Sequence, residues 1–172
     1  MKRTVLMIAM VMALTTIAKA QEQAADRSPI RAYLMYGNGT KGIPGFTNKH
    51  NAVVGGGELL LNNGFGVGMD FGGRGKLSCE KCEAQTNVAL FGSYNLPLTG
   101  SLSQLEPFVN GGYAFVSPKG WNISDHMVSF GGGVNYWLGQ GFGVRMEARD
   151  NLSFKNGTAH YPEYRIGVIA EF

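Results

Sequence analysis

The chain has 172 residues, with 26 glycines and 15 basic against 12 acidic residues. Its length predicts a single domain. Three basic residues, Lys2, Arg3 and Lys19, fall within the first twenty positions, so the rest of the chain has 12 basic and 12 acidic residues and no formal net charge. We therefore expect no nucleic-acid partner. After residue 20 the chain has no run of ~20 apolar residues, so we expect no transmembrane helix there.

Residues 1–20 predict a cleaved signal peptide. A basic start precedes an apolar stretch over residues 5–17, which is short for a membrane span. Ala18-Lys19-Ala20 then has the small-x-small pattern of a cleavage site, so the mature chain is expected to begin at Gln21. A retained anchor helix is the alternative. Residues 21–28 are polar and predict a flexible lead into the domain.

Four strands are expected in the first half of the domain, over residues 30–36, 51–61, 65–72 and 85–96. In the third of these, Phe65, Val67, Met69 and Phe71 alternate with glycine and Asp70, which is the two-residue period of a strand. The Asn-Gly pair at 63–64 predicts a tight hairpin turn. The stretches 37–50 and 73–83 are rich in turn residues and predict longer loops.

Four more strands are expected over residues 107–116, 126–138, 142–150 and 164–172. The connection 139–141 is short, 97–106 is of medium length, and 117–125 and 151–162 are long. Long and short connections therefore alternate along the chain. Short turns at one end and long loops at the other are typical of outer-membrane barrels. The sequence predicts an all-β, eight-stranded antiparallel up-and-down transmembrane β-barrel over residues 29–172.

The polar face of the predicted strands indicates which side of the sheet is inside. It contains no lysine, is rich in Gly, Ser and Asn, and carries the charged residues Glu58, Asp70, Arg145, Glu147, Arg149, Arg165 and Glu171. Arg–carboxylate pairs among small residues suit a narrow interior. We predict that the first six of these side chains form an ion-pair network in the lumen. The alternatives are a lining for a small-ion path, or a soluble barrel whose interior is the apolar face and binds an apolar ligand.

Outward-facing aromatic residues are expected at two levels. Phe65, Tyr94, Tyr136, Phe142 and Phe172 fall near the strand ends joined by short turns, and Phe71, Phe115 and Tyr164 fall near the ends joined by long loops. Two aromatic belts are what the two membrane interfaces favour.

The last strand carries the most specific motif. Apolar and aromatic side chains occupy every second position up to the final residue: Tyr164, Ile166, Val168, Ala170 and Phe172. This resembles the carboxy-terminal insertion signal of bacterial outer-membrane barrels, which the barrel-assembly machinery reads. With the triple glycine 131–133 and the Gly143-x-Arg145-x-Glu147-x-Arg149 strand, residues 29–172 resemble the small eight-stranded outer-membrane barrel family, the OmpA transmembrane-domain-like and OmpX-like group.

The resemblance implies a location in the Gram-negative outer membrane, in contact with its lipid and lipopolysaccharide. It implies a structural or surface-recognition role through extracellular loops, where Lys41, Phe46, Trp121 and Lys155 are candidate contacts by position. A narrow pore is the first alternative and a lipid A-modifying enzyme the second. We expect no enzymatic activity, cofactor or metal site. His126 and Ser129 are the nearest candidate base and nucleophile, but they are expected on opposite faces of one strand.

Cys79 and Cys82 lie in the loop 73–83. In an exported protein this spacing favours a disulfide; free thiols, or a metal or redox role, are the alternatives. The glycine pattern at 37, 39 and 42 matches a dinucleotide fingerprint in letters, but Pro44 and Gly45 follow it where a helix would be needed. We therefore expect no nucleotide site there.

Overall fold

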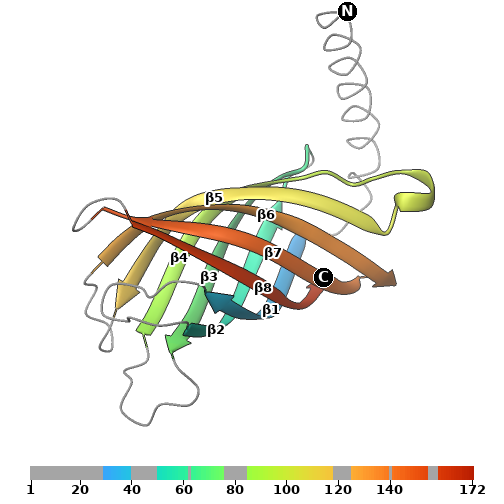
Figure 1. Cartoon of the computed structure of the whole chain (residues 1–172). Helices are drawn as coiled ribbons and strands as arrows, with labels where there is room; N and C mark the ends of the chain where they lie inside the picture. The colour runs from blue at the N-terminus through green and yellow to red at the C-terminus, as the bar shows by residue number, and fades with distance from the viewer. Residues whose placement is uncertain are drawn as a thin grey trace, which may run out of the picture.

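The computed structural model describes residues 29–39, 50–61, 63–75, 85–117, 125–139, 141–154 and 159–172. The predicted signal peptide, the flexible lead, and Cys79 and Cys82 lie outside these ranges. The described chain forms eight strands and one short 3₁₀ helix, shown in Figure 1: β1 Ile30–Gly39, β2 His50–Leu60, β3 Phe65–Gly75, β4 Gln85–Asn95, η1 Gly100–Leu102, β5 Leu105–Ser117, β6 Asp125–Gly139, β7 Phe142–Ser153 and β8 Ala159–Glu171. Within this part of the chain, no helix has the length and apolar character needed to cross a membrane.

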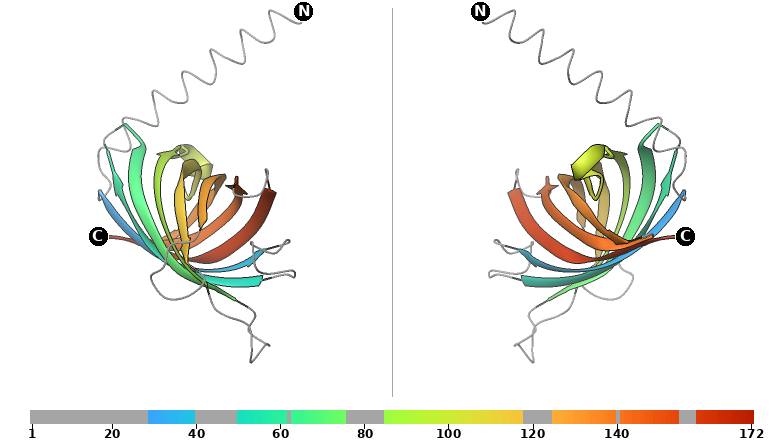
Figure 2. Two further views of the ribbon diagram at one scale, coloured as in Figure 1. Left: turned by 90° about the vertical axis from the view of Figure 1, so that its left-hand side faces the viewer. Right: turned by 90° about the vertical axis from the view of Figure 1, so that its right-hand side faces the viewer.

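The strands form one closed barrel. Each strand pairs antiparallel with the next, and β8 pairs with β1 to complete the ring (Figure 2). At the seam the backbone N–H of Phe172 donates to the carbonyl of Ile30 over 2.9 Å. The predicted fold, an eight-stranded antiparallel up-and-down barrel, is confirmed. Closure leaves no unpaired sheet edge.

The connections differ between the two ends of the barrel. One end, called here the short-turn end, has the connections 61–64, 96–104 and 140–141. Gly64 and Gly141 adopt φ values of 82° and 77°, which side chains rarely tolerate, and so allow two of these turns to be tight. The other end, called the long-loop end, has the connections 40–49, 76–84, 118–124 and 154–158. The two short turns are where they were predicted. The connection 96–104, predicted to be of medium length, has nine residues, as many as 76–84 and more than 118–124 or 154–158, so the predicted alternation of connection lengths holds only in part.

Several strands are longer than predicted. β3 extends to Gly75, β7 extends to Ser153, and β8 begins at Ala159 rather than at Tyr164. β5 begins at Leu105, two residues before the predicted start. Polar, glycine and proline residues at these ends look like loop, but the neighbouring strand continues the ladder: Ser153 pairs with Ala159, and Pro162 pairs with Asp150.

The barrel is polar and charged inside and apolar outside. Alternate side chains of β1 are buried and exposed, with Arg31 in the lumen and Ile30 and Leu34 more than half exposed on the outer surface. The lumen also contains two small apolar clusters, one around Tyr33 and Phe91 and one around Val116 and Met127. The predicted orientation of the two faces is therefore correct. The alternative of an apolar cavity is wrong, because charged side chains fill the interior.

Candidate functional site: the charged lumen

Ten buried charged side chains point into the lumen: Arg31, Arg74, Arg145, Arg149, Arg165, Glu58, Asp70, Glu106, Glu147 and Glu163. They come from six strands, because every second residue of a strand faces inward. All five cations are arginines, and the described part of the chain contains no lysine. Guanidinium groups can bind carboxylates through two nitrogens at once, which a lysine cannot do.

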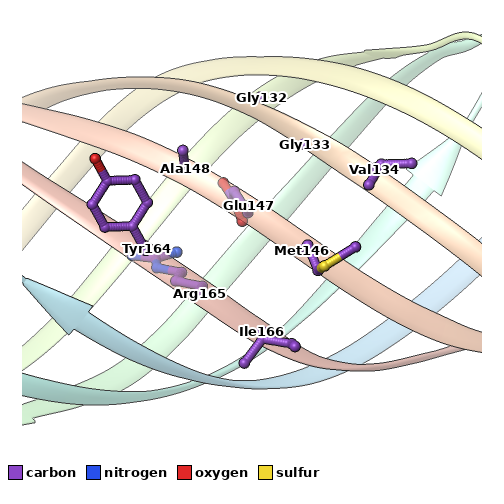
Figure 3. Close-up of a pocket in the computed structure, with 9 residues that line it drawn as sticks. All are labelled: Gly132, Gly133, Val134, Met146, Glu147, Ala148, Tyr164, Arg165 and Ile166. Atoms are coloured by element: carbon purple, nitrogen blue, oxygen red, sulfur yellow. The ribbon is translucent and has the colours of Figure 1, made fainter.

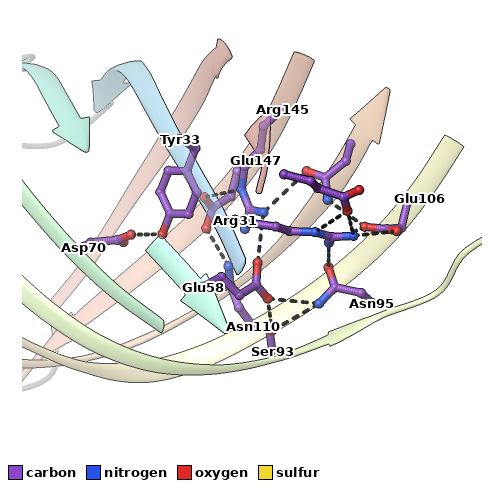
Figure 4. A network of polar contacts seen from close by, with 12 residues as sticks. Arg31, Tyr33, Glu58, Asp70, Ser93, Asn95, Glu106, Asn110, Arg145 and Glu147 are labelled. Atoms are coloured by element: carbon purple, nitrogen blue, oxygen red, sulfur yellow. Dashed lines mark hydrogen bonds and ion pairs between the residues drawn. The ribbon is translucent and has the colours of Figure 1, made fainter. Parts of the chain in front are cut away.

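The first group lies at the short-turn end and is centred on Arg31. Its guanidinium contacts both carboxylate oxygens of Glu106, at 2.6 and 3.0 Å (Figure 4). It also contacts one oxygen of Glu171 at 2.6 Å. The Arg31 guanidinium also lies 5.1 Å from the ring of Trp137. Three strands, β1, β5 and β8, therefore meet at one cation.

The second group lies in the middle of the barrel around Arg145. Its guanidinium is 3.6 Å from Glu58 and 3.9 Å from Glu147. The rings of Phe108 and Tyr33 lie against it, with centroids 3.8 and 4.8 Å from the guanidinium carbon. Cation–π contacts of this kind strengthen in a desolvated site, so this cation is stabilised by aromatic faces as well as by carboxylates.

Two buried asparagines join the first and second groups. The Asn95 amide donates to Glu58 over 2.9 Å, and its oxygen accepts from Arg31 over 3.3 Å. Asn135 links the same two groups by a second route. The hydroxyl of Ser93 also donates to Glu58. The first and second groups, at the short-turn end and in the middle of the lumen, therefore form one connected network.

The third group lies toward the long-loop end. Asp70 accepts from Arg149 at 2.5 Å and from Arg165 at 3.2 Å. Glu163 in turn contacts Arg165 at 2.5 Å and Arg74 at 3.0 Å. Three guanidinium groups thus share two carboxylates. Arg149 also contacts Glu147 of the middle group, with 2.6 Å between Arg149 Nη2 and Glu147 Oε1.

These side chains fill the middle of the lumen, where Arg145 and Asp70 are 0% exposed. Two grooves lined by described residues lie on the outer surface. One of about 480 Å³ crosses β6, β7 and β8, with Gly132 and Ala148 at its base and Met146, Tyr164 and Ile166 around it (Figure 3).

Comparison with known proteins identifies the fold. Neither a protein-family model nor a curated protein sequence matches the chain. Among solved structures it is similar to Neisserial surface protein A (TM-score 0.65, 13% identity, 84% of this chain and 98% of the other). It is also similar to the N-terminal barrel domain of Pseudomonas aeruginosa OprF (TM-score 0.63, 13% identity, 83% and 96%) and to a de novo designed transmembrane β-barrel (0.60, 14%, 84% and 96%).

The chain has the fold of an eight-stranded outer-membrane β-barrel. The resemblance of residues 29–172 to that group is therefore confirmed at the level of fold.

Within this outer-membrane barrel fold, all six charged residues predicted for the lumen lie in the network. Five further members of the network, Arg31, Arg74, Glu106, Glu163 and Glu171, are absent from the predicted set. Arg74 and Glu106 fall in stretches predicted as loops, and Glu163 falls between the predicted loop 151–162 and the predicted strand 164–172. Arg31 and Glu171 lie on the inward faces of predicted strands. The sequence signal for Arg74, Glu106 and Glu163 is the two-residue period, which continues beyond the ends of the predicted strands, as in Glu163-x-Arg165.

The outer surface of the barrel carries the outward side chains of the last strand and the candidate base His126. Tyr164, Ile166, Val168 and Phe172 are exposed on it, and Ala170 is partly exposed. His126 is exposed among the rings of Tyr113 and Phe115, whereas Ser129 is buried in the lumen, so the two lie on opposite faces as predicted. Among the described residues, no group of three or more His, Cys, Asp and Glu is arranged to hold a metal ion.

The two carboxylates on Arg31 are expected to differ in their contribution to stability. Glu106 is fully buried and binds through both oxygens, whereas the Glu171 side chain is partly exposed. We expect Glu106→Gln to lower the free energy of unfolding by about 3 kcal/mol and Glu171→Gln by about 1 kcal/mol. Urea unfolding in detergent, followed by tryptophan fluorescence, measures both. An equal loss of unfolding free energy in the two variants would contradict the expectation that the more buried carboxylate contributes more.

Proposed function

We propose that the protein is an outer-membrane β-barrel with a structural or surface-recognition role, in which a closed barrel holds four long connections at the cell surface. The observation that carries this proposal is the inversion of the two faces. A charged lumen inside an apolar outer surface suits a barrel surrounded by lipid, where every backbone group must be paired within the structure.

The distribution of outer side chains supports a membrane location. Phe65 and Tyr94 lie side by side near the short-turn end, with ring centroids 4.8 Å apart, while Phe71 and Tyr164 are exposed toward the long-loop end. These positions match the two aromatic belts expected of a spanning barrel. In this proposal the short-turn end faces the periplasm, the signal peptide is removed on export, and the outward row on β8 is read by the assembly machinery.

The positions of the lysines support a role for the long connections. After residue 20 every lysine falls in the connections of the long-loop end: Lys41, Lys49, Lys76, Lys81, Lys119 and Lys155. Ammonium groups at this level suit the phosphates of lipopolysaccharide or an anionic ligand outside the cell. Lys41, Phe46, Trp121 and Lys155 remain the proposed contacts.

The paired charged side chains that fill the middle of the lumen favour this role over a pore. Single-channel recording in a planar bilayer tests the choice, with protein extracted from cells that express the full chain. We expect no discrete current steps from the wild type, from Arg145→Ala or from Glu147→Ala. The control is a faster-migrating unboiled band on a gel, which shows that each sample is folded. Wild-type steps whose ion selectivity changes in these variants would support the pore instead.

A non-catalytic role is part of the same proposal. His126 and Ser129, the nearest candidate base and nucleophile, are separated by the barrel wall. General-base activation of a nucleophile requires the two groups within hydrogen-bond reach. Unchanged lipid A in expressing cells is the corresponding expectation for mass spectrometry.

A further inference from the structure

The outer wall of the barrel carries one carboxylate. Among the described residues, Asp150 of β7 is the only Asp, Glu, Lys or Arg at an outward position of a strand. Its partners in the neighbouring strands are Phe130 of β6 and Pro162 of β8, so its surroundings across the sheet are apolar. Charged side chains on a membrane-facing surface are costly and commonly mark a functional site.

Two contacts hold Asp150 in place. Its Oδ1 accepts from the backbone N–H of Tyr161 over 3.0 Å, and its Oδ2 lies 2.7 Å from Nδ1 of His160. An ionised carboxylate has roughly four lone-pair positions, so Asp150 can still accept from a ligand. The His160 side chain is 57% exposed. Because Nδ1 is directed at Asp150, Nε2 lies on the other side of the ring.

The outer-surface groove of about 480 Å³ begins next to this pair. Ala148 at its base is the next outward position of β7 after Asp150, about 7 Å away along the strand. Tyr164 lies on the side of the groove nearer to the long-loop end, and Met146 and Ile166 lie farther toward the short-turn end (Figure 3). A polar pair therefore stands at one end of an apolar groove, which matches the two parts of a single lipid molecule.

We propose that this part of the wall binds one zwitterionic phospholipid with a primary ammonium headgroup, its acyl chain in the groove and its headgroup at Asp150 and His160. The choice of headgroup rests on charge complementarity. The N–H groups of the ammonium donate to Asp150, and the phosphate accepts from Nε2 of the protonated His160 ring. A purely anionic headgroup would meet the carboxylate as a like charge.

Two further features fit a lipid as the occupant. Tyr164 lies between the chain and the headgroup, which is the level that tyrosine favours at a membrane interface. A second copy of this chain would need roughly 800 Å² of contact per partner and would cover the Asp150–His160 pair with a largely apolar wall. The site rests on the proposed membrane location, because only a barrel surrounded by lipid presents this wall to phospholipid.

Native mass spectrometry of the full chain, extracted from expressing cells into detergent, tests the site. Phosphatidylethanolamine and phosphatidylglycerol with identical acyl chains are the two probes. We expect one bound phosphatidylethanolamine, and about tenfold weaker binding of phosphatidylglycerol. Asp150→Asn should weaken the binding of phosphatidylethanolamine by about tenfold and remove the preference, because hydrogen bonds to a charged acceptor are lost.

The groove is tested by a matched pair of variants. Ala148→Leu fills the groove and should weaken the binding of phosphatidylethanolamine, whereas Ala32→Leu makes the same exchange at an outward position of β1 and should leave it unchanged. The faster-migrating unboiled band shows that each variant is folded.

Equal binding of the two lipids by the wild type, or an unchanged preference in Asp150→Asn, would overturn the headgroup site alone. A dimer that disappears in Ala148→Leu, in place of a lipid adduct, would assign the groove to a second copy of the chain. Protein that stays in solution without detergent and shows no shifted band would contradict the proposed membrane location, and this site with it.

Discussion

Asp70→Asn is expected to lower the free energy of unfolding by about 3–5 kcal/mol, because it removes one of the two carboxylates that each of two buried guanidinium groups contacts. Asp70 is 0% exposed and accepts from Arg149, Arg165 and the hydroxyl of Tyr33. An amide at this position carries no charge and presents an NH₂ group to donors. Urea unfolding in detergent micelles, followed by tryptophan fluorescence, measures the loss.

Asp150→Asn is the matched control for this prediction. Asp150 pairs with His160 at 2.7 Å on the outer surface, where the His160 side chain is 57% exposed. Exposed ion pairs contribute about 1 kcal/mol or less, so this variant is expected to lose no more than that. If Asp70→Asn lost as little as Asp150→Asn, the lumen network would not be a source of stability.

Gly167→Ala is expected to destabilise the barrel by about 3 kcal/mol or more, or to prevent it from closing. Gly167 faces the lumen at the β1–β8 seam, opposite Met35 on one side and Arg145 on the other. A Cβ atom there would lie 2.5 Å from the Met35 Cα and 2.8 Å from the Leu34 carbonyl carbon. These are backbone atoms, so relief of the clash requires the two strands to separate. The fraction of protein in the unboiled, faster-migrating band and the urea midpoint both report the effect.

Gly92→Ala serves as the control for glycine replacement. Gly92 faces outward on β4, and the nearest atom to an added Cβ is the Gly66 carbonyl oxygen at 3.9 Å. The change is therefore expected to stay within about 0.5 kcal/mol. A similar loss in both variants would show that backbone freedom, rather than the close approach of β1 and β8, explains the glycine at 167.

The fold could be predicted from the sequence because its signals are local. Phe65, Val67, Met69 and Phe71 alternate with small residues and Asp70, and such a period specifies both a strand and its two faces. The absence of lysine on the polar face, together with Arg145, Glu147 and Arg149 in alternate positions, indicated a lumen rather than a solvated surface. Eight such segments with alternating connection lengths leave few other architectures.

The partners within the lumen could not be predicted in the same way. Arg31 binds Glu171, 140 residues away, and Arg149 binds Asp70, 79 residues away. Such pairs depend on the register around the whole ring, which no short segment contains. Glu106 and Glu163 lie outside the predicted strands, and each is next to a proline, Pro107 or Pro162. Those prolines are accommodated within the ladders, opposite Val134 and Asp150.

The contact of Arg31 with Glu171 has a consequence for how the barrel assembles. It joins the first strand to the last, so it cannot form until all eight strands are present and the ring closes. Before closure, five buried arginines and their carboxylates would lie on the face of an open sheet. Such a sheet could not enter hydrocarbon without exposing unpaired ions to it. Ring closure and entry into the bilayer must therefore occur as one coupled step, with the charges neutralised as the strands meet.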